Sequence, residues 1–96
     1  MTLTPQTIKS KITPTLKRQG VTKAALFGSV VRGELKKTSD IDILVEFKPG
    51  KTLLDLAGLQ IELEDLLKRK VDVVTYRSLH PLLRDRILKE QQPIYG

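Results

Sequence analysis

Two aspartates, Asp40 and Asp42, are separated by one residue at the start of an alternating segment of the sequence, Asp-Ile-Asp-Ile-Leu-Val-Glu-Phe at residues 40–47. Apolar residues at every second position predict a strand, with residues 41, 43, 45 and 47 facing a core. Alternate side chains of a strand point to one face, so the two carboxylates should project from the same side, with Cα atoms about 6.5–7 Å apart. Carboxylates at this spacing can bind one hard divalent cation or a pair of them. Ordinary solvent-exposed strand residues would show the same pattern, so the pair alone does not establish a site.

A glycine–serine pair lies upstream of the two aspartates. Gly28 and Ser29 follow residues 21–27, whose apolar character predicts a buried strand. Glycine allows a backbone conformation that bulkier residues resist, and the free N–H groups of such a turn, with a serine hydroxyl, can bind phosphate oxygens. A lone Gly-Ser pair is most often a simple turn. Ten residues separate Ser29 from Asp40, and the combined pattern G-S-x10-D-x-D is more specific than either part.

A third acidic residue, Asp72, interrupts the apolar segment Val-Asp-Val-Val-Thr at residues 71–75, which also predicts a strand. A carboxylate in such a strand is costly to bury unless it is paired or bound to a metal. If this strand lies beside residues 40–47, Asp72 completes a cluster of three carboxylates.

Helical and extended segments alternate along the chain. The pair Thr4-Pro5 predicts a helix start, and apolar residues at positions 8, 12 and 16 predict a helix to about residue 19. Pro14 conflicts with this helix, because it removes a backbone hydrogen bond and clashes with the preceding turn, so we expect a kink there or a break into two short helices. The other predicted elements are a strand at 21–27, a helical turn at 29–35, a strand at 40–47, a long amphipathic helix at 53–67, a strand at 71–75 and a helix from 80 to about 90. This order predicts a layered α/β fold in which helices cover a small sheet.

The length and composition exclude several classes of protein. The 96 residues allow one domain, residues 1–96, and the sequence has no cysteine, which excludes disulfides, thiolate metal sites and cysteine nucleophiles. The longest apolar run, residues 24–27, is far shorter than the about 20 residues that cross a bilayer. The N-terminal segment lacks the apolar stretch of a secretory signal. A soluble cytoplasmic domain with no membrane partner is therefore expected.

Charge is unevenly distributed along the chain, whose net charge is +6. Residues 1–39 carry eight basic and one acidic side chain, whereas residues 40–72 carry five basic and eight acidic ones. A basic front half can attract nucleic acid, nucleotide phosphates or an acidic protein, although a solvated surface is the simpler interpretation. Carboxylates gathered within a basic protein indicate a bound cation that itself bridges to a polyanion.

Taken together, the segments 28–34, 40–42 and the aspartate at 72 resemble the minimal nucleotidyltransferases of the DNA polymerase β-like superfamily. The resemblance extends from about Val21 to Tyr95 and is most specific in G-S-x-x-R-G-E and D-x-D. The pair Val30-Val31 departs from the family pattern, in which an aromatic or small residue is commoner at these positions. This difference affects packing near the glycine–serine turn rather than the candidate ligands. The resemblance implies an α/β fold of the α+β type, with a small mixed sheet of three to four strands and helices packed mainly on one face.

The same resemblance implies a nucleotidyltransferase that joins an acceptor hydroxyl to the α-phosphorus of ATP and releases pyrophosphate. Two Mg²⁺ ions about 3.5–4 Å apart can stabilise both the attacking and the leaving oxygen in such a reaction. On this basis Asp40 and Asp42 are expected to bind the metals that bridge to the triphosphate. Asp72 is expected to hold the metal nearer the acceptor and to help remove the hydroxyl proton.

The same resemblance assigns phosphate binding to the glycine–serine turn. Gly28 and Ser29 are expected to bind the β- and γ-phosphates. Arg32 either contacts phosphate or pairs with an acid of the site, and a purely structural salt bridge is an equal alternative.

Stand-alone domains of this size in the family often act as antitoxins that silence HEPN-type toxins by adding AMP to a tyrosine. The resemblance therefore implies a protein adenylyltransferase with ATP as substrate and a HEPN-type toxin as partner. Two alternatives remain: a non-catalytic antitoxin that masks its toxin by binding, and an enzyme that modifies a small-molecule hydroxyl such as that of an aminoglycoside. A nucleic-acid partner is not expected, because the chain leaves no module to hold a template. The sequence does not identify the acceptor or the base preference. It also leaves open whether the protein forms a homo-oligomer and whether it is active without a partner.

Overall fold

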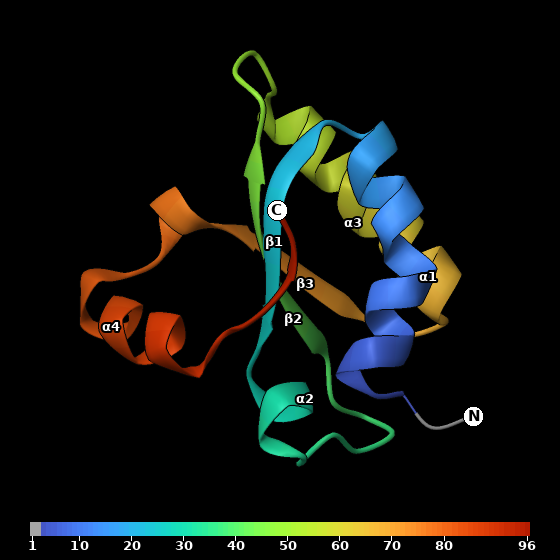
Figure 1. Cartoon of the computed structure of the whole chain (residues 1–96), viewed down its shortest axis with the longest axis vertical. Coiled ribbons are helices and arrows are strands. Elements are labelled where there is room, and N and C mark those ends of the chain that lie inside the picture. The colour runs from blue at the N-terminus through green and yellow to red at the C-terminus, as the bar shows by residue number, and fades with distance from the viewer. Residues whose placement is uncertain (1–2) are drawn as a thin grey trace.

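The computed structural model describes residues 3–96 as helices and strands that alternate along the chain (Figure 1). The elements are α1 (Pro5–Arg18), β1 (Val21–Phe27), α2 (Ser29–Arg32), β2 (Ile41–Phe47), α3 (Leu53–Leu67), β3 (Val71–Thr75), the 3-10 helix η1 (Tyr76–Ser78), α4 (Pro81–Glu90) and β4 (Gln92–Tyr95). Within these described residues, no helix is long and apolar enough to cross a membrane.

The four strands form one mixed sheet in the order β3-β2-β1-β4. Strand β1 is antiparallel to both of its neighbours, β2 and β4, whereas β3 runs parallel to β2. Parallel neighbours need a long crossover, and helix α3 provides it here. The sheet therefore has the mixed character that the resemblance implied, and β4 is its fourth strand.

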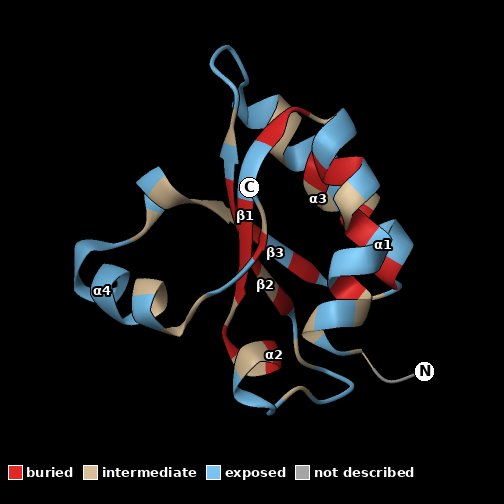
Figure 2. Cartoon of the chain, in the orientation of Figure 1, coloured by how far each residue is buried: buried red, intermediate tan, exposed pale blue. Residues whose placement is uncertain are grey.

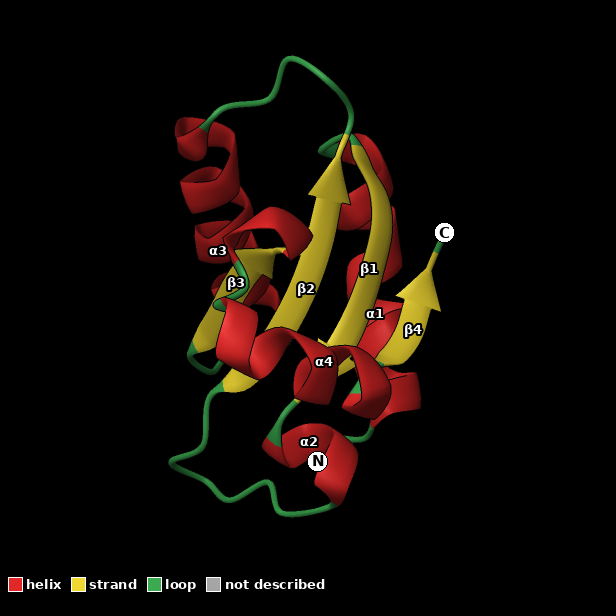
Figure 3. Cartoon of the chain, turned by 90° about the vertical axis from the view of Figure 1, so that its left-hand side faces the viewer, coloured by secondary structure: helices red, strands yellow, loops and turns green. Residues whose placement is uncertain are grey.

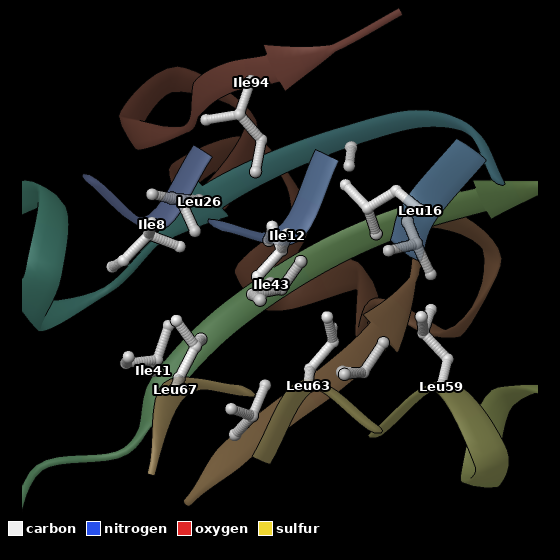
Figure 4. Packing of buried hydrophobic residues seen from close by; sticks show 14 of the residues in the cluster. Ile8, Ile12, Leu16, Leu26, Ile41, Ile43, Leu59, Leu63, Leu67 and Ile94 are labelled. Atoms are coloured by element: carbon white, nitrogen blue, oxygen red, sulfur yellow. The ribbon is translucent and has the colours of Figure 1, made fainter. Parts of the chain in front are cut away.

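The hydrophobic core lies on one face of the sheet, beneath α1 and α3 (Figures 1 and 2). Each helix contributes residues at a spacing of four, which places them on one stripe of the helix surface. Figure 4 shows these side chains interdigitating with those of the strands. The fully buried members include Ile8, Ile12 and Leu16 of α1, Leu59 and Leu63 of α3, Leu26 of β1, and Ile41, Ile43 and Val45 of β2.

The opposite face of the sheet is partly covered by α4, which crosses in front of the strands in Figure 3. Ala25 of β1 and Leu44 of β2 are paired in the sheet register and point to this face, and both are fully buried. Helix α4 itself has no buried residue, and Leu82 is 86% exposed. The second face is thus only lightly packed.

Helix α1 confirms the predicted start and corrects the prediction at Pro14. The Thr4 side chain accepts a hydrogen bond from the Thr7 N–H, and the Thr7 side chain accepts one from the Thr4 N–H, so the two form a capping box. The helix then runs through Pro14 as a single element to Arg18, so the predicted break is wrong. An interior proline costs about 3 kcal/mol. Burial of Ile12 and Leu16 on either side of Pro14 outweighs that cost.

A matched pair of substitutions in α3 tests the one-sided core. Leu63 is fully buried, whereas Ile61, two residues earlier, is 68% exposed. We expect Leu63→Ala to lower the free energy of unfolding by about 2–5 kcal/mol, because it removes buried methyl groups and leaves a cavity. Ile61→Ala should change it by less than about 0.5 kcal/mol. Urea unfolding followed by circular dichroism measures both, and equal losses would contradict this assignment of the core face.

Candidate functional site

The register of β2 and β3 places two of the three predicted aspartates side by side. Asp42 pairs with Asp72 across the parallel strands, so both side chains project from the face opposite the main core. Asp40 directly precedes β2 and is exposed, as is Asp72, whereas Asp42 is partly buried. The strand expected over residues 40–47 therefore begins one residue later, at Ile41. The structure brings the three predicted acids to the same end of the sheet.

The electrostatics of this end of the sheet are dominated by negative charge around Asp42. Burial, and then the nearby charges of Asp72 and Asp40, raise the pKa of Asp42 to about 6 from its ordinary value of 3.8. Arg32 opposes this rise, and Glu90 adds to it. Within residues 3–96, no three acidic, histidine or cysteine side chains are drawn together tightly enough to form a complete metal-ligand set by themselves. Two carboxylates with substrate phosphates are nevertheless sufficient for Mg²⁺, which seldom relies on protein ligands alone.

Gly28 lies directly against the Asp42 carboxylate. It links β1 to α2 with φ 78° and ψ −150°, a conformation that is essentially restricted to glycine. A Cβ atom at this position would lie 2.2 Å from Oδ2 of Asp42. Because Phe27 pairs with Asp42 in the sheet, the turn that follows β1 has to pass over this carboxylate. Gly28 and Ser29 are thereby brought to the acidic end of the sheet, as the sequence predicted.

Arg32, the last residue of α2, forms two ion pairs. Its Nε lies 2.6 Å from Oε1 of Glu34, and its Nη1 lies 2.5 Å from Oε1 of Glu90. These two hydrogen bonds raise the pKa of the guanidinium above its ordinary value. The salt-bridge alternative for Arg32 therefore describes its contacts in this structure, and Arg32 still lies close enough to Asp42 to lower the pKa of that carboxyl.

Glu90, at the end of α4, was not identified by the sequence patterns. Its carboxylate accepts a hydrogen bond from the Gly28 N–H at 3.2 Å and pairs with Arg32. Burial raises the pKa of Glu90, but the hydrogen bonds from Arg32 and Gly28 outweigh burial and leave that pKa lowered. In the sequence this residue only ends a predicted helix. The contact with Gly28 spans 62 positions, so no local pattern could have revealed it.

A hollow in the described surface lies elsewhere, at the opposite ends of β2 and β3. It has a volume of about 640 Å³ and is lined by residues such as Glu46, Lys51 and Tyr76, but by none of the three aspartates. The Tyr76 hydroxyl contacts the Gln91 side chain at 3.1 Å, and Lys23 Nζ lies 4.8 Å from the centre of the Tyr76 ring. Tyr76 therefore has a packing role here, and the hollow is separate from the acidic end.

Two glycines allow the close approach at Gly28 to be tested against a matched control. We expect Gly28→Ala to destabilise the protein by about 2–3 kcal/mol, because alanine is strained in this conformation and its methyl group would displace Asp42. Gly33→Ala should cost about 1 kcal/mol, because Gly33 has φ 73° but nothing within 4 Å of the added methyl group. Chemical denaturation measures both, and equal costs would show that the contact with Asp42 is unimportant.

The raised pKa of Asp42 predicts a specific dependence of stability on pH. In the folded state its pKa is about 6, above the value of about 3.8 expected when unfolded, so stability is lost as the pH rises from about 4 to 6. Asp42→Asn removes this charge and should raise stability at pH 7.5 by about 1 kcal/mol, a value reduced because the group is partly exposed. This corresponds to a Tm increase of roughly 4–8 °C.

Thermal unfolding at several pH values measures this effect. Most of the gain from Asp42→Asn should disappear at pH 3.5, where Asp42 is protonated in the folded state and largely protonated in the unfolded state. Asp85→Asn, a change of the same type on the exposed face of α4, should alter stability by less than about 0.5 kcal/mol at either pH. A lower Tm for Asp42→Asn at pH 7.5 would contradict the repulsion described for the acidic end.

Comparison with known proteins connects this geometry to a family. A family model described as a nucleotidyltransferase domain matches residues 9–94. The relative MJ0435 of Methanocaldococcus jannaschii, named “Putative protein adenylyltransferase”, is 61% identical over 83 residues, which are 86% of this chain and 89% of the relative.

Solved structures share the same arrangement of helices and strands. A structure described as a “putative minimal nucleotidyltransferase” has a TM-score of 0.82 at 40% sequence identity, covering 95% of this chain and 96% of that one. A structure described as a toxin–antitoxin with AMP-PNP has a TM-score of 0.80 at 27% identity, covering 92% of this chain and 73% of that one. With a fold shared with these structures and a family model matched over most of its length, the chain belongs to the nucleotidyltransferase family and has the minimal nucleotidyltransferase fold.

Proposed function

We propose that this nucleotidyltransferase transfers AMP from ATP to a hydroxyl group of a partner protein, and that it is the antitoxin of a toxin–antitoxin pair. The observation that carries the proposal is the meeting of the Gly28 turn with the paired aspartates Asp42 and Asp72 at one end of the sheet. The name of the M. jannaschii relative and the structural likeness to a toxin–antitoxin with AMP-PNP support the acceptor and the partner.

The acidic residues suit a magnesium ion. Burial, and then the charges of Asp72 and Asp40, raise the pKa of Asp42, and a bound cation would stabilise its ionised form. The available ligand atoms are carboxylate oxygens, which Mg²⁺ prefers. Asp40, Asp42 and Asp72 would hold the metal together with the phosphates of ATP. When bound, Mg²⁺ stabilises negative charge on the attacking and leaving oxygens of phosphoryl transfer.

Other residues of the chain bind the phosphates and accept the proton of the acceptor hydroxyl. The Gly28 N–H and the Ser29 hydroxyl bind the β- and γ-phosphates, and Arg32 adds a positive charge beside them. Asp72 takes the proton of the acceptor hydroxyl, whose oxygen forms a bond to the α-phosphorus. The bond between the α-phosphorus and the bridging oxygen breaks, and pyrophosphate leaves with that oxygen. The products are an AMP ester of the acceptor and pyrophosphate.

The exposure of the site favours a protein acceptor. Asp40 and Asp72 lie at the surface, and the lightly packed α4 covers only part of this face (Figure 3). Phosphoryl transfer gains when water is excluded and the attacking hydroxyl is oriented. The surface of a partner, a HEPN-type toxin in this proposal, would supply that cover and carry the hydroxyl.

The proposal is tested by incubating the protein with the cognate toxin, Mg²⁺ and ATP labelled at the α-phosphate. Label should appear on the toxin, and the double variant Asp40→Asn, Asp42→Asn should lower the labelling rate by roughly a hundredfold or more. The surface variant Asp65→Asn, on helix α3 at the other face of the sheet, serves as the control and should label at the normal rate.

Two other results would overturn the proposed reaction. Protection of cells from the toxin by the double variant would indicate an antitoxin that masks its toxin by binding alone. Labelling of a free aminoglycoside with none on any protein would indicate a small-molecule acceptor.

A further inference from the structure

The Glu90 carboxylate occupies the donors that the proposed function assigns to phosphate. Oε2 of Glu90 accepts the Gly28 N–H at 3.2 Å, and Oε1 lies 2.5 Å from Nη1 of Arg32. One carboxylate therefore uses a backbone N–H and a guanidinium together, and phosphate oxygens favour the same pair of donors. The Glu90 side chain is only 18% exposed, so its charge is held inside the turn.

The rest of α4 holds Glu90 in place only weakly. No residue of α4 is buried, and its Leu82 and Leu83 are 86% and 48% exposed. The side chain of Arg84 reaches the Tyr76 carbonyl at a distance of 3.4 Å, which is a long hydrogen bond. Moving the Glu90 side chain out of the turn would thus expose little apolar surface, and local rearrangements of this kind are favoured where packing is sparse.

The negative charge of Glu90 also acts on the neighbouring acid. It is one of the charges that raise the pKa of Asp42. A polyphosphate that approaches the turn meets this additional negative charge as well as occupied donors. Only after Glu90 has moved are both the Gly28 N–H and the Nη1 group of Arg32 free for an anion.

We propose that Glu90 is a built-in competitor of the nucleotide, whose carboxylate binds Gly28 and Arg32 in the place of phosphate and must be released before the triphosphate binds. This inference rests on the proposed function, since it takes the Gly28 turn as the triphosphate site. It makes Glu90 a positioning residue that sets nucleotide affinity through Arg32 and the turn. It also links α4, on the face where a partner would bind, to the binding of ATP.

Calorimetric titration of the full chain with inorganic tripolyphosphate, in the presence of Mg²⁺, tests the competition. Glu90→Gln keeps the size of the side chain and removes its charge, and it should bind tripolyphosphate roughly tenfold more tightly than the unmodified chain. Glu34→Gln is the matched control, because Glu34 also pairs with Arg32 but has no contact with Gly28. Its effect on affinity should be much smaller.

The amide resonance of Gly28 gives a second measurement that a merely structural role would not predict. The Glu90→Gln substitution should shift this resonance, and tripolyphosphate should shift it again in both proteins, at lower concentrations in the variant. If Glu90→Gln does not fold, Glu90→Asp replaces it, since the shorter side chain withdraws from Gly28 while it keeps its charge. This variant should also bind tripolyphosphate more tightly.

Unchanged or weaker tripolyphosphate binding in the Glu90 variants would overturn the inference, because it would mean that Glu90 supports the site rather than competes for it. The transfer assay distinguishes this failure from a failure of the proposed function. Tighter binding in Glu90→Gln without transfer of AMP to any protein by the unmodified chain would contradict the proposed reaction and leave the competition standing. Transfer of AMP with unchanged binding in the variants would contradict the competition alone.

Discussion

The close approach of the Gly28 backbone to the Asp42 carboxylate is the constraint on which the rest of the site depends. With 2.2 Å between a hypothetical Cβ and Oδ2, only glycine fits, and its backbone conformation is one that other residues avoid. The antiparallel register that pairs Phe27 with Asp42 brings the turn there. The parallel register that pairs Asp42 with Asp72 then adds the second carboxylate. Three segments separated along the chain are thereby joined within a few ångströms at one end of the sheet.

The one-sided core allows this concentration of charge. Strand β2 directs Ile41, Ile43 and Val45 into the layer beneath α1 and α3, and this burial supplies the main stabilisation of the fold. Its other face is free to carry carboxylates. The burial of Asp42, together with repulsion from Asp72 and Asp40, opposes folding at neutral pH. Proteins commonly accept such a local loss of stability at the residues that carry function. Because the side chains of β2 alternate, one face of this strand stabilises the fold and the other destabilises it.

Helix α4 has a different character from α1 and α3. It buries none of its own residues, yet its last residue contacts the turn after β1 through Gly28 and Arg32. A contact between charged groups on a sparsely packed helix is easily exchanged for another anion, whereas the packed core cannot rearrange without opening cavities. The same chain thus combines aspartates on a packed sheet with a carboxylate that a sparsely packed helix holds beside them.

Local sequence patterns were sufficient to predict the positions of the four α-helices, three of the strands and the aspartates of the acidic end. Periodicity placed the core stripes of α1 and α3, and the alternation at residues 40–47 assigned the aspartates to one face, because both are properties of neighbouring residues. Three further features depend on the folded chain: α1 continues through Pro14, residues 92–95 form a strand beside β1, and Glu90 contacts Gly28. Each of these depends on partners distant in the sequence: the buried face that outweighs the proline, the free edge of β1, and a turn 62 residues away. Local patterns carry no information about such partners, since the energy that selects them arises only when the chain has folded.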